Sequence, residues 1–212
     1  MQIRLSEIAK RYHRWIFQEV DYLFEAPGAY GITGSNGTGK STLLAITAGY
    51  VTPTRGTVRF LSDNGNAISQ DRIHQHLSIA APYISVVGEL SIEEHLKFHT
   101  RFKSLIDPLN MEDFFQISGL DGYRSVLVSH LSSGLQQRFK LALALLCESP
   151  IIFLDEPTSY LDEKSKIWFA QLFHSYTRNR LLIMASNDAS DLALTQIRLE
   201  IESFGEIDRE GN

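Results

Sequence analysis

The stretch GSNGTGKST at residues 34–42 fits the pattern G-x-x-x-x-G-K-[ST], which is typical of a phosphate-binding loop. Its glycines permit tight turns that bring successive backbone N–H groups toward an anion. Lys40 supplies a positive charge for the β- and γ-phosphates of a nucleotide, and the Ser41 hydroxyl suits Mg²⁺. The apolar run 29–33 predicts a buried strand before the loop, and 40–48 predicts a helix whose positive end faces the phosphates. This context disfavours a chance glycine-rich turn and predicts an α/β nucleotide-binding core.

The composition is that of a globular protein with enough apolar residues for a large core. The chain has 212 residues, of which 43% are hydrophobic, so we expect one large domain or a core with one inserted subdomain. The formal net charge of −5 disfavours a nucleic-acid-binding face, although it leaves room for a local basic patch. The single cysteine, Cys147, rules out an internal disulfide, and its apolar helical surroundings predict a packing role.

The sequence contains no pattern for insertion into a membrane. No run reaches about 18 apolar residues, and the charged N-terminal segment lacks the features of a secretory signal. If the protein works at a membrane, we expect a partner to supply the spanning part.

Alternating and continuous apolar runs predict strands of two kinds. Residues 3–24 alternate in the manner of antiparallel strands, and Asn64-Gly65 indicates a hairpin turn after a strand over 56–61. Short apolar runs predict buried strands of a central sheet, and they lie at 77–81, 151–154 and 181–185. Residues 196–204 are expected to form an edge strand, followed by an acidic, frayed tail.

Between about residues 85 and 129, the sequence pattern becomes typical of helices. Ser91 and Glu94 have the spacing of a capping box, which predicts the start of a helix over 92–103. A second helix is expected over 111–117, with a stop near Gly119. These helices indicate an insert between two halves of an α/β core.

His95 and His99 lie one helical turn apart in the first of these helices. A metal site is one interpretation of this spacing, because two such imidazoles lie on one helix face. The order H-E-x-x-H and a third ligand are both lacking, so solvated or rim histidines are expected instead.

Two polar stretches follow the insert. The first, LSSGLQQR at 131–138, precedes an apolar helix that runs to about Cys147, and its serine and glycine can receive an anion at the helix N-terminus. On its own, this stretch is better explained as an ordinary N-cap. The second is the pair Asp155 and Glu156, which ends the apolar strand 151–154. Asp155 is suited to hold Mg²⁺ through its water shell, and Glu156 to orient or deprotonate a water that attacks a γ-phosphate.

Two aromatic residues near the N-terminus, Tyr12 and Trp15, are candidates to stack on a nucleotide base. Packing within the protein explains them about equally well at this stage.

Three motifs occur in a characteristic order: GSNGTGKST, LSSGLQQR and IIFLDEPTSYLD. In this order and over this length, the chain resembles the ATP-binding cassette (ABC) ATPases, from Tyr12 to Asn187. The resemblance implies a P-loop NTPase core of mainly parallel sheet, with an N-terminal antiparallel β part and an inserted helical subdomain. It implies a single domain over 1–212, with the core at 1–84 and 130–212 and the helical subdomain at about 85–129.

The resemblance also implies a role for each residue that matches a family motif. The ATP-binding residues it implies are Tyr12 (with Trp15 as the fallback), Gly34, Ser35, Asn36, Gly37, Thr38, Gly39, Lys40, Ser41 and Thr42. Glu156 would be the catalytic carboxylate, assisted by Lys40 and Asn187, while Ser41 and Asp155 would hold Mg²⁺, the latter through water. Leu161-Asp162 matches a loop that crosses the dimer interface. The signature residues, which would act on the ATP of a second subunit, are Ser132, Ser133, Gly134, Leu135 and Gln136.

On this basis we expect an ATP-hydrolysing subunit that energises a separate transmembrane permease, with ATP and Mg²⁺ as its cofactors. A second cassette, identical or different, should complete each site, and no direct nucleic-acid partner is expected. The expected location is cytoplasmic, at the inner face of the cell membrane through the permease. The alternatives are a soluble cassette ATPase that acts on ribosomes or DNA, and a slow-hydrolysing switch that dimerises on binding a nucleotide.

Three departures from the family pattern concern the site. LSSGLQ differs by two residues from the LSGGQ-type signature. Tyr83 stands where the family has a glutamine that senses Mg²⁺, and Asn187 where it has a histidine that contacts the γ-phosphate. Asparagine still donates a hydrogen bond but carries no charge. Losing about 1–2 kcal/mol of transition-state stabilisation predicts hydrolysis that is about 5- to 30-fold slower.

Overall fold

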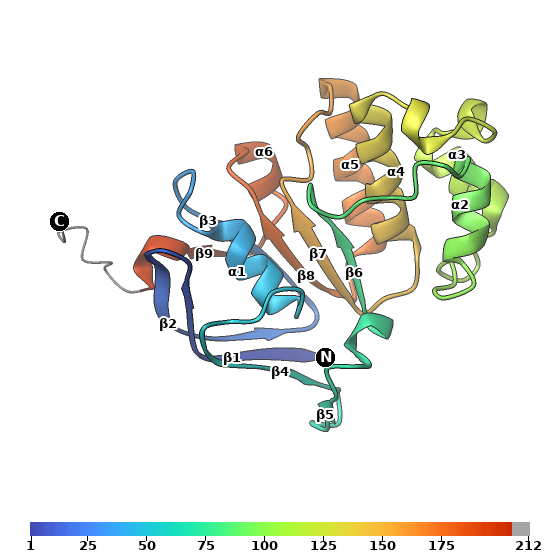
Figure 1. The fold of residues 1–212 in the computed structure, drawn as a ribbon. Helices are drawn as coiled ribbons and strands as arrows, with labels where there is room; N and C mark the ends of the chain where they lie inside the picture. The colour runs from blue at the N-terminus through green and yellow to red at the C-terminus, as the bar shows by residue number, and fades with distance from the viewer. Residues whose placement is uncertain (205–212) are drawn as a thin grey trace.

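The structure is a computed structural model that describes residues 1–204, and it contains two sheets with helices between and beside them (Figure 1). One sheet is antiparallel, with the strand order β2-β1-β4-β5. Its strands are β1 (Gln2–Arg11), β2 (Trp15–Glu25), β4 (Arg55–Leu61) and β5 (Ala67–Ile68). This result confirms the antiparallel strands predicted from residues 3–24. It also confirms the turn at Asn64-Gly65, across which β4 and β5 pair.

The second sheet has the order β6-β7-β8-β3-β9, and all of its strand pairs are parallel. Its strands are β3 (Gly28–Thr33), β6 (Leu77–Ala80), β7 (Ile151–Asp155), β8 (Leu181–Ala185) and β9 (Ile197–Glu200). Because the strands are parallel, their carboxyl ends lie at one edge of the sheet, which is where open α/β sheets bind ligands. Both the phosphate loop and the acidic pair lie at this edge.

Side chains of the parallel sheet alternate between two hydrophobic cores. In β7, Ile151 and Phe153 belong to one core, while Ile152 and Leu154 belong to the other, and all four are fully buried. Successive side chains of a strand point to opposite faces, so burial on both faces requires apolar residues at every position. This requirement explains the continuous apolar runs in the sequence.

The helix that follows the phosphate loop, α1 (Lys40–Thr47), lies between the two sheets (Figure 1). Its residues Leu43 and Leu44 share a core with Ile3 and Phe17 of the antiparallel sheet. The antiparallel sheet therefore covers the helix that carries the phosphate loop, and this packing fixes the loop against the parallel sheet.

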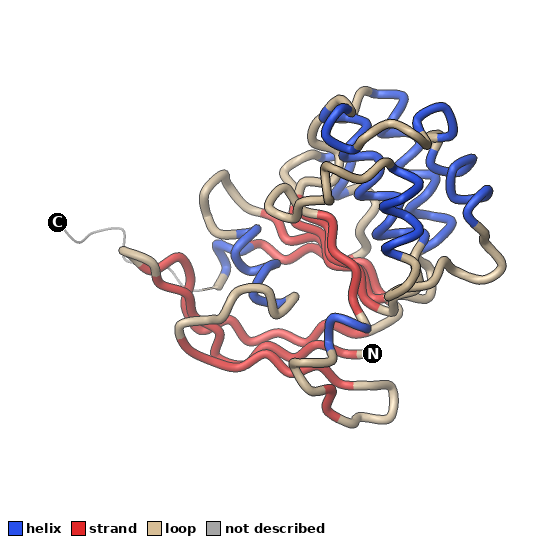
Figure 2. The backbone as a smooth tube through the Cα atoms, turned by 45° about the vertical axis from the view of Figure 1, so that its right-hand side comes forward, coloured by secondary structure: helices blue, strands red, loops and turns tan. Residues whose placement is uncertain are grey.

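The remaining helices gather beyond the other face of the parallel sheet (Figure 2). They are α2 (Ile92–His99), α3 (Met111–Ser118), α4 (Ser133–Leu146) and α5 (Glu163–Tyr176), with the short α6 (Ala189–Leu192) near the carboxyl ends of the strands. Within residues 1–204 there are also four short 3₁₀ segments: η1 (Ile73–Gln75), η2 (Asp121–Tyr123), η3 (Val128–His130) and η4 (Ile201–Ser203). The capping box of Ser91 and Glu94 is confirmed, and Gly119 ends α3 in the left-handed conformation.

Two elements are shorter than the sequence predicts. The helix expected over 92–103 ends at His99, with Thr100 as its C-cap, and the chain then turns so that the Lys103 ammonium reaches the Leu77 carbonyl. The strand expected over 196–204 ends at Glu200 and continues as η4. The frayed tail that we predicted lies outside the described residues.

The single cysteine has the packing role that the sequence predicts. Cys147 is fully buried, and burial raises the pKa of its thiol to about 12. Within residues 1–204, no helix has both the length and the apolar character needed to cross a bilayer.

The histidine pair of α2 differs from the prediction in one respect. His95 is 6% exposed and packs edge to face on Phe139, so the expectation of a solvated or rim residue is wrong for it. Burial also lowers the pKa of both imidazoles, to about 4 for His99. The described residues contain no cluster of three His, Cys, Asp or Glu side chains that could hold a metal ion.

Candidate functional site

The phosphate loop links β3 to α1 and has the backbone conformations that its glycines permit. Gly37 has φ of +81° and Gly39 has φ of +104°, both in the left-handed region that favours glycine. A Cβ at Gly37 would meet no atom within 4 Å, so the loop is open there. A Cβ at Gly39 would clash with Ile16 of β2, so this glycine also allows the antiparallel sheet to approach closely.

Lys40 lies inside the curve of the loop. Its side chain is 6% exposed, and its ammonium donates to the Gly34 and Ser35 carbonyls at 2.8 and 3.1 Å. The first residues of the loop and the first residue of α1 are therefore tied together by a positive charge. This arrangement keeps the ammonium beside the open side of the loop, where phosphate oxygens can be bound.

Ser41 and Asp155 meet across the gap between α1 and β7. The Ser41 hydroxyl donates to Asp155 Oδ1 at 2.9 Å. Asp155 is 2% exposed, and burial raises its pKa to about 6, partly opposed by the Ser41 hydrogen bond. A hydroxyl and a buried carboxylate are the hard oxygen donors that Mg²⁺ prefers, and a nearby dication favours the charged form of the carboxylate. The residues therefore fit a magnesium ion.

Glu156 follows Asp155 in a strained conformation. Its φ is +45°, in the left-handed region that costs a non-glycine residue about 1–3 kcal/mol. Its backbone N–H donates to the Ala185 carbonyl at 2.8 Å, which ties the end of β7 to the end of β8. The Ser186 hydroxyl lies 3.3 Å from Glu156 Oε2. This strain at the carboxyl edge of the sheet, beside the phosphate loop, is consistent with a functional role for Glu156.

Asn187 contacts the phosphate loop directly. Its side-chain amide donates to Asn36 Oδ1, although the two residues are 151 positions apart in the chain. The next residue, Asp188, accepts from Lys166 at 2.8 Å and caps α6 through the Ser190 N–H. The structure thus brings Asn187 beside the phosphate loop, and its contact with a γ-phosphate stays a prediction.

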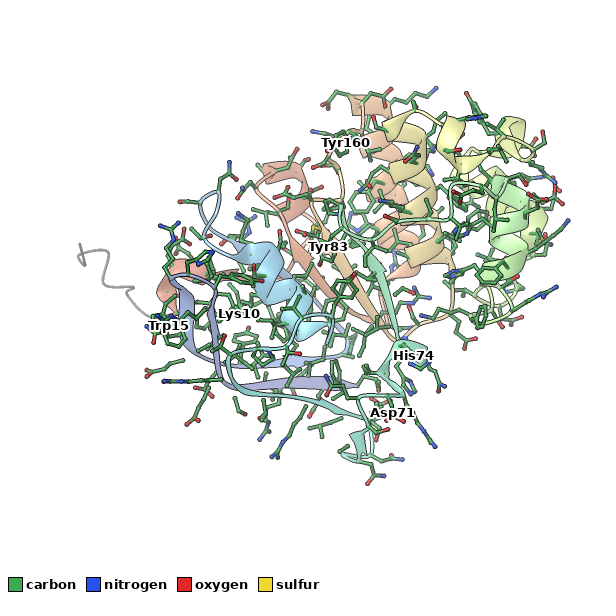
Figure 3. All side chains as sticks on the ribbon, in the orientation of Figure 1. Lys10, Trp15, Asp71, His74, Tyr83 and Tyr160 are labelled. Carbon is green, nitrogen blue, oxygen red and sulfur yellow. The ribbon has the colours of Figure 1, made fainter. Side chains whose placement is uncertain are left out.

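Tyr83 lies just beyond β6, near the carboxyl ends of the parallel strands (Figure 3). Burial and the nearby negative charge of Asp155 raise the pKa of its phenol. Its ring stacks on Tyr50, with 5.5 Å between ring centroids. The residue that replaces the family's glutamine is therefore close to the predicted magnesium site.

The two candidate base-stacking residues differ in how far neighbouring side chains cover their rings. Tyr12 is 59% exposed, and the Lys10 ammonium lies 4.9 Å from its ring centroid. Trp15, at the start of β2 (Figure 3), has the guanidinium groups of Arg11 and Arg55 over its ring at 5.6 and 5.4 Å. Tyr12 therefore offers more free aromatic surface than Trp15. Base stacking stays a prediction for both residues.

The signature segment begins α4. Ser132 is its N-cap and accepts from the Leu135 N–H at 3.3 Å, which agrees with an ordinary N-cap. A Cβ at Gly134 would lie 2.9 Å from the Tyr160 carbonyl, so this glycine lets α4 approach the segment between β7 and α5, where Tyr160 is found (Figure 3). Among residues 1–204, no hydrogen bond joins the signature to the phosphate loop.

Three residues at the site were missed in the sequence. Glu202 of η4 accepts from the Ser35 N–H at 2.7 Å and so fixes the start of the phosphate loop. Ser186 and Asp191 form a buried pair beside Glu156. No motif marks these residues. Only the neighbouring positions of β7 and β8 in the parallel sheet could have indicated Ser186, because that topology joins their carboxyl ends.

A phosphate loop, a buried aspartate that accepts from the Ser41 hydroxyl and a glutamate that follows it at the same strand end define a P-loop nucleotide-binding protein. A family model for the ABC transporter family matches residues 17–159. The cytochrome c biogenesis ATP-binding export protein CcmA of Rhizobium etli is 32% identical over 210 residues, which cover 95% of this chain and 94% of CcmA. The uncharacterized ABC transporter ATP-binding protein YybJ of Bacillus subtilis is 28% identical over 88% of this chain and 85% of its own length.

Solved structures agree on the fold. A putative ABC transporter ATP-binding protein from Pyrococcus furiosus superposes with a TM-score of 0.78 at 19% identity and covers 97% of this chain and 100% of its own. The cassette MJ0796, dimeric and bound to ADP and Pi, gives 0.79 at 23% identity over 99% of this chain and 97% of its own. The chain belongs to the ABC transporter family and is an ATP-binding subunit of it, as its three motifs led us to expect. Membership implies ATP binding and hydrolysis, dimeric cassettes and transmembrane partner components.

Proposed function

We propose that this chain hydrolyses ATP to ADP and phosphate with Glu156 as the catalytic carboxylate, and that this activity is coupled to transport by a separate permease. The observation that carries the proposal is the junction of the phosphate loop with two strand ends. Ser41 bonds to Asp155 at the end of β7, and Asn36 bonds to Asn187 at the end of β8. These contacts support a single site made of the binding loop, the predicted metal residues and Glu156.

The mechanism assigns each residue one task. The loop residues 34–42 bind the phosphates, with the Lys40 ammonium on the β- and γ-phosphates. Mg²⁺, when bound by Ser41 and through water by Asp155, would neutralise charge on the phosphate oxygens. Glu156 orients the attacking water and accepts its proton, and the Asn187 amide donates to a γ-phosphate oxygen.

We further propose that hydrolysis is slow for a protein of this family. Asn187 provides a neutral hydrogen bond where a charged donor would be about twice as strong. Tyr83 offers a phenol, with a pKa raised by burial, in place of an amide oxygen near the metal site. The contact of Asn187 with Asn36 supports this part of the proposal, because it holds Asn187 beside the phosphate loop. A nucleotide-dependent dimerisation switch with slow turnover is the second candidate function.

Replacing Asn187 with histidine tests the proposed cause of slow turnover. We expect kcat for ATP hydrolysis to rise about 5- to 30-fold, because about 1–2 kcal/mol of transition-state stabilisation is regained. The measurement is steady-state phosphate release with Mg-ATP. Asn179→His, in the turn before β8, serves as the matched control and should leave kcat unchanged. An unchanged rate in Asn187→His would mean that the asparagine is not limiting.

The partners that we propose are a second cassette, which supplies Ser132 to Gln136, and a permease. The domain division that we propose places the nucleotide-binding core at 1–84 and 130–212 and the helical subdomain at about 85–129. In this arrangement the protein is cytoplasmic and is held at the inner face of the membrane by the permease.

An exposed aromatic pair supports docking of the permease on the helical subdomain. Phe98 and Phe102, at the end of α2 and just beyond it, are 49% and 76% exposed, and their ring centroids lie 5.3 Å apart. Adjacent exposed aromatic rings favour burial against an apolar partner surface. The transmembrane components implied by the family are partners of that kind.

Introducing a negative charge into the pair of Phe98 and Phe102 tests whether the permease binds there. We expect Phe102→Asp to reduce the fraction of the full-length protein recovered with the membrane at least about tenfold, because a buried charge costs well over 1.4 kcal/mol. ATP hydrolysis by the purified protein should stay unchanged. Ile167→Asp, on the exposed side of α5, is the control and should bind membranes normally. If both variants are recovered equally with the wild type, the docking site is elsewhere. If the wild type is absent from membranes, the transport assignment fails.

A further inference from the structure

The Ser186 hydroxyl lies between two carboxyl groups. Ser186 Oγ is 2.7 Å from Asp191 Oδ2 and 3.3 Å from Glu156 Oε2, and it accepts from the Asp188 N–H at 3.0 Å. Among residues 1–204, Ser186 is the one side chain that hydrogen-bonds to the Glu156 carboxylate. The orientation of Glu156 therefore depends on what holds Ser186.

Asp191 is the second carboxyl group that contacts Ser186. It is 1% exposed, and its Oδ2 accepts from both Ser186 and Thr158, the latter at 3.1 Å. Its other oxygen, Oδ1, is buried and has no hydrogen-bond partner among the described residues. Burying a carboxyl oxygen without a hydrogen-bond partner costs free energy of folding, so the presence of Asp191 at this position needs a reason.

The buried carboxyl group of Asp191 fixes the position of the serine hydroxyl. Burial raises the pKa of Asp191, partly opposed by the hydrogen bonds from Ser186 and Thr158, and the charge of Asp188 raises it further. The nearby cation Lys166 is bound to Asp188 at 2.8 Å. A serine hydroxyl has one proton, and both carboxyl groups lie within hydrogen-bond distance of it, so Asp191 and Glu156 share Ser186 as a donor.

We propose that Asp191 and Ser186 are positioning residues for Glu156: Asp191 holds the Ser186 hydroxyl, and Ser186 holds the Glu156 carboxylate. This inference rests on the proposed role of Glu156 as the catalytic carboxylate. Ser186 donates to Glu156 Oε2 and fixes the rotamer of the glutamate, so that the other oxygen is directed toward the attacking water. Thr158 bonds to Asp191 but not to Glu156, and it therefore serves the fold alone.

The test compares variants at Ser186 in the full-length protein with Mg-ATP. We expect Ser186→Ala to lower kcat about tenfold, while KM for ATP stays within about twofold, because a positioning contact acts on the transition state. Ser186→Thr restores a hydroxyl and should recover at least half of the wild-type kcat. Should the alanine variant be too unstable to purify, Ser186→Cys fills the same space with a weak donor and should show a loss of the same order.

Two further variants separate positioning from folding. Thr158→Val removes the other hydrogen bond to Asp191, and it should lower the thermal midpoint but keep kcat within about twofold. In a Glu156→Gln background, Ser186→Ala should cause no further loss, since the serine acts through the glutamate.

The inference is overturned if Ser186→Ala keeps the wild-type kcat, or if Thr158→Val loses as much activity as Ser186→Ala. It is also overturned if the double variant loses kcat by the product of the factors measured for Glu156→Gln and Ser186→Ala alone. A wild-type rate in Glu156→Gln alone would instead refute the proposed catalytic role of Glu156. The two failures are therefore distinguishable.

Discussion

Replacing Glu156 with glutamine should lower kcat for ATP hydrolysis about 10²- to 10⁴-fold, the range typical of removing a general base. The amide keeps the size of the side chain and can still accept from Ser186, but it takes no proton from water. Nucleotide binding should be unchanged, because the phosphate loop and the contact of Ser41 with Asp155 are left in place. Phosphate release at saturating Mg-ATP measures the rate, and equilibrium titration with a fluorescent ATP analogue measures binding.

The matched control is Glu148→Gln, an exposed glutamate that follows α4 and lies away from the strand ends that carry the site. It removes the same charge and should leave kcat and binding unchanged. Equal rates for Glu156→Gln and the wild type would remove Glu156 from the mechanism, and weakened nucleotide binding would mean that it has a structural role instead.

The parts of the site that could be predicted from the sequence are those in which local chemistry decides the structure. Gly37, Gly39 and Lys40 form the loop through their own backbone freedom and charge, so a short pattern suffices to identify it. Asp155 and Glu156 follow a continuous apolar run, and a strand buried on both faces of a parallel sheet must present its next polar residues at the carboxyl edge.

The contacts that the sequence did not predict join segments far apart in the chain. Ser186 meets Glu156 only because β8 lies beside β7, and strand order is not encoded in either segment. Glu202 meets Ser35 because β9 ends early and turns into η4. His95 is buried by Phe139 from another helix, although its own helix has a polar character. Each result depends on tertiary packing, which overrides local pattern.

Replacing Lys40 with alanine should have an equally large effect, on binding rather than on the chemical step. Two charge-assisted hydrogen bonds to the β- and γ-phosphates are lost, each worth about 1.5–3 kcal/mol, so the affinity for ATP should fall about 10²- to 10⁴-fold. The rate of hydrolysis at ATP concentrations below saturation should fall together with the affinity. Equilibrium titration with ATP, carried out with and without Mg²⁺, measures the change.

The loss at Lys40 has a second component, because its ammonium also donates to the Gly34 and Ser35 carbonyls. Lys40→Met retains the apolar stem and loses only the charge, so it should weaken ATP binding as much as Lys40→Ala if the ammonium is what matters. Lys164→Ala, an exposed lysine on α5, controls for net charge and should bind ATP normally. Thermal unfolding without nucleotide then separates the two components. A lower midpoint in both Lys40 variants, together with unchanged ATP affinity, would show that the lysine serves only to close the loop.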